Sequence, residues 1–181
     1  MAALIRSEER RKCTVLGLQP VHSQALHYVS QCNKYSDTPA ALAKYLGMTR
    51  GTVSQTVSLL EKKGYLKKTP DTTDRRVVHL VLMPEGRAII EQSKPGELLY
   101  QATTHLKQNS HLDYETVFAN ALSALQKANR SQSFGLCKTC RYFTSTTDGF
   151  VCGLTKELLT QSDSEKICQE HNIADRVAIN P

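Results

Sequence analysis

Apolar residues recur at the three- and four-residue spacing of amphipathic helices along the first half of the chain. This spacing predicts a first helix over residues 2–16, which Gly17 ends, and a second helix from Pro20 to about Gln31. The segment 33–37 is polar and predicts a break after the second helix.

A closely spaced pair of helices is predicted next. Thr38 caps a short helix that Gly47 ends, and Thr49 caps a longer helix that runs to Lys63. One side of the longer helix is apolar, at positions i, i+4 and i+7: Val53, Val57 and Leu60. The other side holds small or polar residues: Arg50, Gly51, Ser54, Gln55 and Ser58.

Two strands joined by a polar loop are predicted after this pair. The first is Tyr65–Thr69, the second is Val77–Leu82, and the sequence PDTTDRR connects them. The sequence Pro-Glu-Gly at 84–86 opens a further helix, and a break that contains Pro and Gly lies at 93–97. Another helix is predicted over residues 114–128.

The order of helix, short helix, tight turn, helix and hairpin is the plan of a winged helix-turn-helix. An α-helix fits the major groove of DNA, which is about 12 Å wide, and the first helix of the pair braces the second against the backbone. The hairpin carries Arg75 and Arg76 outward, where they can reach phosphates or the minor groove. The predicted fold class is therefore mainly α with a small β-hairpin wing.

Residues 18 to about 92 resemble the MarR family of multiple antibiotic resistance regulators. The resemblance is carried by GLQPVHSQALHYV and then by ALAKYLGMTRGTVSQTVSLLEKKGYLKKTPDTTDRRVVHLVLMPEG. Its most specific signature is Asp71-x-x-Asp74-Arg75-Arg76, followed by a β-rich run and Pro-Glu-Gly. The resemblance implies that the second helix of the pair lies in the major groove, that a wing arginine enters the minor groove, and that the terminal helices of two chains form a dimer.

Carried over to this sequence, the implied DNA contacts are Thr49, Arg50, Thr52, Ser54, Gln55, Arg75 and Arg76. Arg75 is the implied wing-tip residue, whereas Arg76 is expected to pair with Asp71 or Asp74 and to hold the wing. For the polar residues of the helix, the alternative is an ordinary solvated face with no partner.

The distribution of charge agrees with a polyanionic partner for the first half of the chain. Residues 1–95 hold 15 Lys and Arg against 8 Asp and Glu, whereas residues 96–181 hold 8 against 9. The basic half is therefore the half expected to meet DNA. A solvated basic surface would give the same numbers.

Four of the six cysteines fall within 32 residues near the C-terminus, with the spacing Cys137-x2-Cys140-x11-Cys152-x15-Cys168. A cytosolic chain keeps its thiols reduced, so such a cluster favours metal or redox chemistry over a set of structural disulfides. Four thiolates complete a zinc site or an iron–sulfur site. The isolated Cys13 and Cys32 are expected to be small core residues.

The sequences CKTCRYF, CGLTKELL and KICQEH resemble the ligand pattern of high-potential iron–sulfur proteins. This resemblance implies an iron–sulfur cluster, with [4Fe–4S] favoured over [2Fe–2S]. Structural zinc and a metal-free thiol or disulfide sensor remain as alternatives. The residues expected to wrap a cluster, or to form the core of a small lobe, are Tyr142, Phe143, Phe150, Leu154, Leu158, Leu159 and Ile167. We expect His171 to face solvent rather than to replace Cys168 as a ligand.

Four regions are predicted: an N-terminal dimerisation helix (1–17), a winged helix-turn-helix (18–92), a helical dimerisation region (93–130) and a cysteine-rich metal-binding lobe (131–181). The predicted function is a homodimeric transcriptional regulator that binds a pseudo-palindromic operator in double-stranded DNA and responds to its cluster.

An enzyme that uses the CxxC pair is disfavoured, because a redox motif of this kind needs a βαβ context. No apolar run approaches the ~18 residues that a membrane span requires. The N-terminal apolar stretch is too short for a signal peptide, so a cytoplasmic location is expected.

Overall fold

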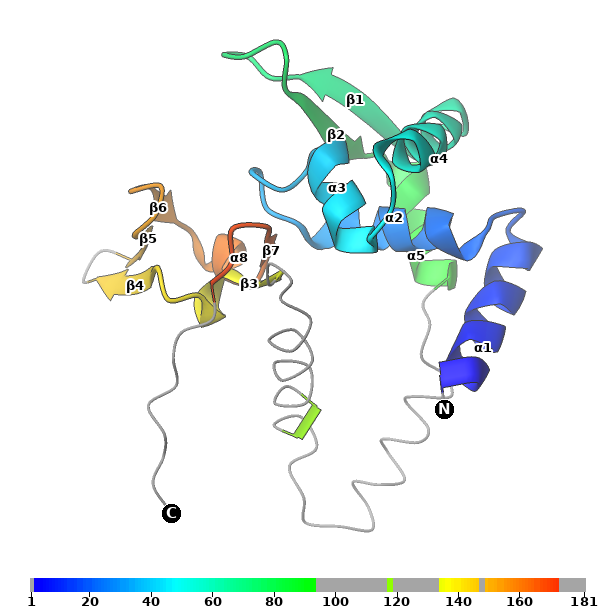
Figure 1. The fold of residues 1–181 in the computed structure, drawn as a ribbon, viewed down its shortest axis with the longest axis horizontal. Coiled ribbons are helices and arrows are strands. Elements are labelled where there is room, and N and C mark those ends of the chain that lie inside the picture. Colours follow the sequence, from blue (N-terminus) through cyan, green and yellow to red (C-terminus); the bar gives the residue numbers. More distant parts are fainter. Residues whose placement is uncertain (1, 94–116, 119–133, 147–148, 173–181) are drawn as a thin grey trace.

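The structure is a computed structural model that describes residues 2–93, 117–118, 134–146 and 149–172. Four helices open the chain (Figure 1): α1 (Ala2–Val15), α2 (Pro20–Gln31), α3 (Pro39–Leu46) and α4 (Arg50–Lys62). Their bounds agree with the predicted helices to within two residues. The polar break predicted at 33–37 is the connection between α2 and α3.

Threonine caps begin both helices of the predicted pair. The Thr38 hydroxyl oxygen accepts the Ala41 N–H at 3.2 Å, and the Thr49 hydroxyl oxygen accepts the Thr52 N–H at 3.2 Å. Gly47 ends α3 with φ of 64°, a left-handed conformation that suits glycine. The turn that sets α4 against α3 therefore follows from local sequence.

The wing is a two-stranded antiparallel sheet. β1 (Leu66–Pro70) pairs with β2 (Val78–Leu82) in a register that places Leu66 opposite Leu82 and Pro70 opposite Val78. Both strands begin one residue later than predicted. Helix α5 (Pro84–Ser93) follows directly and packs against α2 and α1 (Figure 1).

One apolar core joins α1 to α5 and the wing. The predicted inward residues Val53, Val57 and Leu60 are buried, and each is at most 1% exposed. Cys13 and Cys32 are also buried in this cluster, which confirms their expected role as core residues. The core fixes the orientation of α4, whose polar side is thereby turned outward.

The described residues of 134–172, which we call the cysteine region, form short strands and turns. Strand β3 (Gly135–Leu136) pairs with β7 (Ile167–Cys168), and the two are antiparallel. A second sheet has the order β4 (Phe143–Thr146), β5 (Gly149–Cys152), β6 (Leu158–Leu159). A 3-10 turn, η1 (Cys137–Thr139), and the one-turn helix α8 (Gln161–Ser164) complete it.

The predicted dimerisation region at 93–130 lies outside the described residues, apart from Ser93 and the pair Val117 and Phe118. The helix predicted over 114–128 falls within it. In the described part of the chain, no helix has the length and apolar character needed to cross a membrane.

Candidate DNA-binding surface and cysteine site

The N-terminal turn of α4 presents a polar surface to solvent. All the residues predicted to contact DNA from this helix and its cap are exposed: Thr49, Arg50, Thr52, Ser54 and Gln55. The two threonine hydroxyls lie 2.9 Å apart, so Thr52 takes part in the cap as well as in the surface. A Cβ at Gly51 would meet nothing closer than 3.9 Å. This end of the helix can therefore approach another molecule closely.

The wing loop is held by two aspartates. One carboxylate oxygen of Asp71 accepts the N–H groups of Thr73 (2.7 Å) and Asp74 (2.8 Å), and it also accepts the Thr73 hydroxyl. The hydrogen bond from the Thr73 hydroxyl, followed by those from the two N–H groups, holds the pKa of Asp71 well below its usual range. The loop thus has a defined shape although it lies at the surface.

The two wing arginines differ in their contacts. Arg76 donates to the Asp74 carboxylate from Nε (3.0 Å) and from Nη2 (3.1 Å), which confirms the predicted ion pair with an acidic residue of the wing. Arg75 is exposed, and its side chain forms no hydrogen bond or ion pair with any described residue. Of the two wing arginines, Arg75 is therefore the one that can turn to another molecule without breaking a contact.

Helix α4 is also joined to the first strand of the wing. Glu61 accepts the Lys68 N–H at 3.1 Å and the Lys68 ammonium at 2.8 Å. These hydrogen bonds lower the pKa of Glu61. They connect the helix that carries the predicted groove contacts to the strand that leads to the wing loop.

A histidine clamp connects the wing to the segment before α3, and sequence reasoning missed it. His79 on β2 contacts Asp37 through Nδ1 (2.5 Å) and Asp71 through Nε2 (3.1 Å). The Asp37 contact is the largest cause of a raised pKa at His79, and Asp71 adds to it. The available signal was a histidine inside the otherwise apolar run VVHLVL.

The four C-terminal cysteines come from separate turns and strand ends. Cys137 and Cys140 lie at the two ends of one tight turn, where the Cys140 N–H donates to the Cys137 carbonyl at 3.0 Å. Cys152 ends β5 and Cys168 ends β7, and none of the four forms a disulfide. Burial, with smaller contributions from the other three thiols, raises the pKa of Cys137 to about 11. The four thiols are therefore electrostatic neighbours.

Three of the four sulfur atoms accept hydrogen bonds. Cys140 accepts the Asn172 N–H at 3.4 Å. Burial raises the pKa of Cys152, but hydrogen bonds from Thr155 and from Leu154 outweigh it, so that the pKa of this thiol is lowered. Burial raises the pKa of Cys168, and this is partly offset by hydrogen bonds from the Asn33 side chain and the Glu170 backbone. Donors aimed at sulfur are typical of sites where thiolates bind metals.

As the side chains stand, no group of three or more His, Cys, Asp or Glu residues within the described ranges is arranged to hold a metal ion. The four sulfurs would therefore have to draw together on binding. Their donor chemistry fits a thiolate-bound group. The coordination of such a group by all four cysteines stays a prediction.

His171 is buried, so the expectation that it faces solvent is wrong. Its Nε2 lies 2.9 Å from the Thr139 hydroxyl, and burial lowers its pKa. The ring packs on Gly135, where a Cβ would lie 2.7 Å from the ring atoms. His171 fills space beside the CxxC turn.

The apolar residues expected to wrap the site are only partly enclosed. Phe143 and Phe150 stack with ring centroids 5.0 Å apart. Leu154 and Leu158 are 48% and 76% exposed, so these two leucines do not form a core here, contrary to expectation. Leu158 lies in the edge strand β6, and Leu154 lies in the turn between β5 and β6.

Comparisons with known proteins fit this geometry. Residues 16–77 match the model of the MarR family. The multiple antibiotic resistance protein MarR of Salmonella typhimurium is 36% identical over 69 residues, which is 37% of this chain and 48% of that protein. The transcriptional repressor MprA of Escherichia coli is 25% identical over 113 residues, 61% of this chain and 64% of that one. The chain spans about half the length of MarR.

Solved structures agree on the fold. The Staphylococcus aureus MepR–DNA complex aligns with a TM-score of 0.53 at 21% identity, over 70% of this chain and 91% of that one. BldR of Sulfolobus solfataricus aligns with a TM-score of 0.53 at 20% identity, over 70% of this chain and 86% of that one. The fold is therefore that of the winged helix-turn-helix class.

Within that class, residues 16–77 are similar to MarR-family proteins. The sequence relatives described above are named as a resistance protein and a repressor, not as enzymes, which agrees with the prediction of a non-enzymatic protein.

Proposed function

We propose that this chain is a transcriptional regulator that binds double-stranded DNA through α4 and the wing. The observation that carries the proposal is the exposed, capped polar surface of α4 beside a wing whose Arg75 has no partner among the described residues. In this interpretation Arg50, Thr52, Ser54 and Gln55 contact base edges or phosphates, and Thr49 contacts a phosphate. Arg75 neutralises phosphate or enters the minor groove, and Arg76 reaches the backbone while Asp74 holds it.

We further propose that the operator is pseudo-palindromic and that the regulator is a homodimer. Two half-sites on one face of DNA lie about 34–36 Å apart, and a two-fold dimer matches that spacing. The segments predicted to dimerise carry exposed apolar residues, namely Val15 at 83%, Val117 at 53% and Phe118 at 50%. A second copy of the chain would remove such residues from water. A chain that stays monomeric on its operator would contradict this part of the proposal.

The DNA-binding surface is tested by comparing two exposed arginines. We expect Arg75→Ala to weaken operator binding and to reduce the slope of log affinity against log salt by about one. Arg87→Ala, on the exposed side of α5, is the matched control and should change neither quantity. Equal behaviour of the two variants would contradict the assignment of Arg75.

The reading of bases is tested separately at α4. Gln55→Ala should cost about 1–3 kcal/mol at one base pair and should relax the preference there, while binding to unrelated DNA stays unchanged. A uniform loss on all sequences would instead assign Gln55 to the phosphate backbone.

We propose that Cys137, Cys140, Cys152 and Cys168 hold one iron–sulfur cluster, [4Fe–4S] rather than [2Fe–2S]. Support comes from the CxxC turn that joins Cys137 and Cys140, from the electrostatic interaction of Cys137 with the other three thiols, and from the hydrogen bonds that lower the pKa of Cys152. Such a cluster would supply a centre that gains or loses charge and responds to oxidants. The cysteines of this chain would bind it, and the buried His171 would shield one side from water.

Anaerobic purification tests the cluster directly. We expect brown protein that absorbs visible light and contains about four iron and four sulfide per chain. Cys140→Ser should abolish the absorption, whereas Cys13→Ser, in the core of the winged helix, should leave it unchanged. Colourless protein with one zinc per chain would assign the site to structural zinc instead. Protein that contains no metal would favour the remaining alternative, a metal-free thiol or disulfide sensor.

Finally, we propose that the state of this site modulates operator binding. The measurement is DNA affinity at one salt concentration for the cluster-loaded, reduced and cluster-free forms. We expect the forms to differ by at least about fivefold, the lower end of measured coupling between sites. Equal affinities in all three forms would leave the site purely structural.

A further inference from the structure

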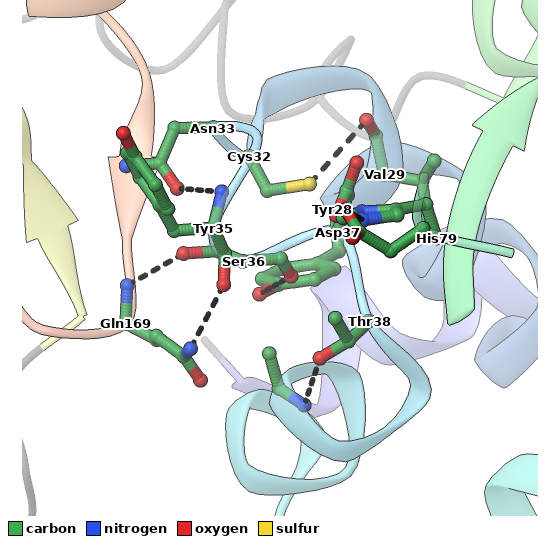
Figure 2. Close-up of polar contacts among 12 residues, drawn as sticks. Tyr28, Val29, Cys32, Asn33, Tyr35, Ser36, Asp37, Thr38, His79 and Gln169 are labelled. Atoms are coloured by element: carbon green, nitrogen blue, oxygen red, sulfur yellow. Dashed lines mark hydrogen bonds and ion pairs between the residues drawn. The ribbon is translucent and has the colours of Figure 1, made fainter. Parts of the chain in front are cut away.

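The cysteine region contacts the winged helix at the connection between α2 and α3, and also through the Phe134 ring, which packs against Tyr28 and Tyr45 with ring centroids 6.2 and 5.3 Å apart. Strand β7 lies beside this connection: the Asn33 N–H donates to the Ile167 carbonyl at 2.9 Å, and Cys32 forms a parallel bridge with Ile167. Figure 2 shows the next two contacts. The Gln169 N–H donates to the Ser36 hydroxyl at 2.8 Å, and the Gln169 side chain donates to the Tyr35 carbonyl at 2.8 Å. We call residues 32–36 the docking segment.

The contacts of β7 lie on both sides of Cys168, one of the four cysteines proposed to bind the cluster. Ile167 and Gln169 are the chain neighbours of Cys168, so both sides of that cysteine are hydrogen-bonded to the docking segment. Asn33 is buried, and its Oδ1 accepts the Tyr35 N–H at 3.2 Å. The Asn33 side chain also lowers the pKa of the Cys168 thiol, which burial raises. A displacement of Cys168 would therefore act directly on the docking segment.

The same segment leads into the DNA-binding elements. The Tyr28 hydroxyl donates to the Ser36 carbonyl at 2.6 Å from the core of α2. The next residue, Asp37, accepts the Leu80 N–H of β2 at 2.6 Å and contacts His79 at 2.5 Å (Figure 2). Thr38 then caps α3. Thus residues 36–38 connect β7 to the start of α3, and through His79 to the wing.

We infer that the cysteine site acts on the DNA-binding surface within one chain, through the docking segment. This inference rests on the proposed function, since it assumes that the cysteines bind a group. With the group bound, Cys168 is fixed and β7 holds residues 33–36. When the group is lost, β7 is released, and the segment that orients α3 and the wing gains freedom.

The first test removes the docking contacts and keeps all four cysteines. The double variant Ser36→Ala/Gln169→Ala deletes the hydroxyl acceptor and the side-chain donor of the contact. The control is Ser30→Ala/Gln161→Ala, because Ser30 bonds only within α2 and Gln161 is exposed on α8. For each protein, DNA affinity is measured with the metal present and after its removal by an iron chelator with an oxidant.

In the parent and the control, we expect the ratio of the two affinities to be about fivefold or more. In the docking variant, with metal content unchanged, the ratio should fall to within about twofold of one. A docking variant that keeps the parent ratio overturns the inference and leaves the proposed function standing. A parent without metal, or with a ratio of one, contradicts the proposed function itself.

A second measurement does not use DNA. Hydrogen exchange is followed at the Asn33, Leu80 and Gln169 amides of the full chain, before and after metal removal. All three donate across the contacts described above. We expect exchange at Asn33 and Leu80 to rise at least tenfold on metal removal, although both residues lie in the winged helix. Faster exchange at Gln169 alone would show that the cysteine region opens without disturbing the winged helix, and this would overturn the inference.

Discussion

The winged helix and the cysteine region are held together by different means. The winged helix buries seventeen apolar residues in one cluster that runs from α1 to α5. In the described part of the cysteine region only Cys137, Ser164 and His171 are buried. Burial of an apolar side chain stabilises a fold by about 1.5–3 kcal/mol, so the core of the winged helix is large enough to stabilise that region. The second has short sheets, contacts with residues 32–36, and the packing of Phe134 against Tyr28 and Tyr45.

Because of this difference, the two regions respond differently to the loss of a single contact. A fold with a large core resists the loss of any one polar contact, whereas a small region with little core is opened by the loss of a single cross-link. A region of the second kind suits a sensor, because a modest chemical change shifts its equilibrium between two states.

Removal of the proposed cluster should affect the two regions differently. After treatment with a chelator and an oxidant, we expect proteolysis within the cysteine region to become at least about tenfold faster, which is a loss of about 1.4 kcal/mol in local opening free energy. The thermal transition of the helical signal should stay in place. The fragments are identified by mass spectrometry. Unchanged cleavage would mean that the short sheets and the docking segment alone hold the region.

A pair of leucines sharpens the contrast in core packing. Leu60 is fully buried, so Leu60→Ala should destabilise the winged helix by about 2–5 kcal/mol. Leu158 is 76% exposed, so Leu158→Ala should change stability by less than about 0.5 kcal/mol. Urea unfolding of both variants measures the two values. A large loss for Leu158→Ala would indicate that this leucine is covered in the assembled protein.

These leucines also show where sequence reasoning succeeded and failed. Leu60 was predicted correctly because the repeat of Val53, Val57 and Leu60 is a local signal for one side of one helix. Leu158 was expected to be enclosed from its apolar character alone. It lies in a two-residue edge strand, and no local pattern specifies which side of so short a strand is covered.

The same distinction applies to the polar contacts. The caps at Thr38 and Thr49 and the pair Asp74–Arg76 join residues two or three positions apart, so the sequence predicts them. The bond between Gln169 and Ser36 spans 133 residues, and the contact of His79 with Asp37 spans 42. Contacts of this length follow from tertiary packing and leave no periodic signal in the chain.

Two glycines test how tightly each region is packed. A Cβ at Gly86, in the Pro-Glu-Gly motif, would lie 2.1 Å from the carbonyl oxygen of Tyr65, which also accepts the Met83 N–H at 3.0 Å. This backbone cannot move easily, so Gly86→Ala should destabilise the winged helix by about 1–3 kcal/mol. At Gly135 the obstacle is the His171 ring, which can turn aside, and we expect a loss of less than about 1 kcal/mol. Thermal unfolding compares them, and equal losses would contradict the difference in packing.

The smallest expected effect is the pH dependence of the histidine clamp. The pKa of His79 is raised from 6.5, chiefly by Asp37, so the contribution of the charged clamp to stability is complete below pH 6.5 and is lost as pH rises through the higher folded value. The pKa of Asp71 is lowered chiefly by hydrogen bonds from Thr73 and Asp74 and only to a lesser extent by His79, so the stability linked to this carboxylate is present above pH 3.8 and is lost as pH falls through the depressed folded value. Because the clamp is partly exposed, we expect it to contribute no more than about 1 kcal/mol.

The matching variant is His79→Gln, which keeps a polar side chain at this position and cannot gain a charge. Stability of the parent relative to this variant, measured by urea unfolding between pH 5 and 9, should decline as pH rises above 6.5. Amide exchange at Leu80 gives a local reading beside the clamp, since its N–H donates to the Asp37 carbonyl. If the difference between the two proteins is the same at every pH, then His79 joins the wing to Asp37 by hydrogen bonding alone and its charge has no part in the contact.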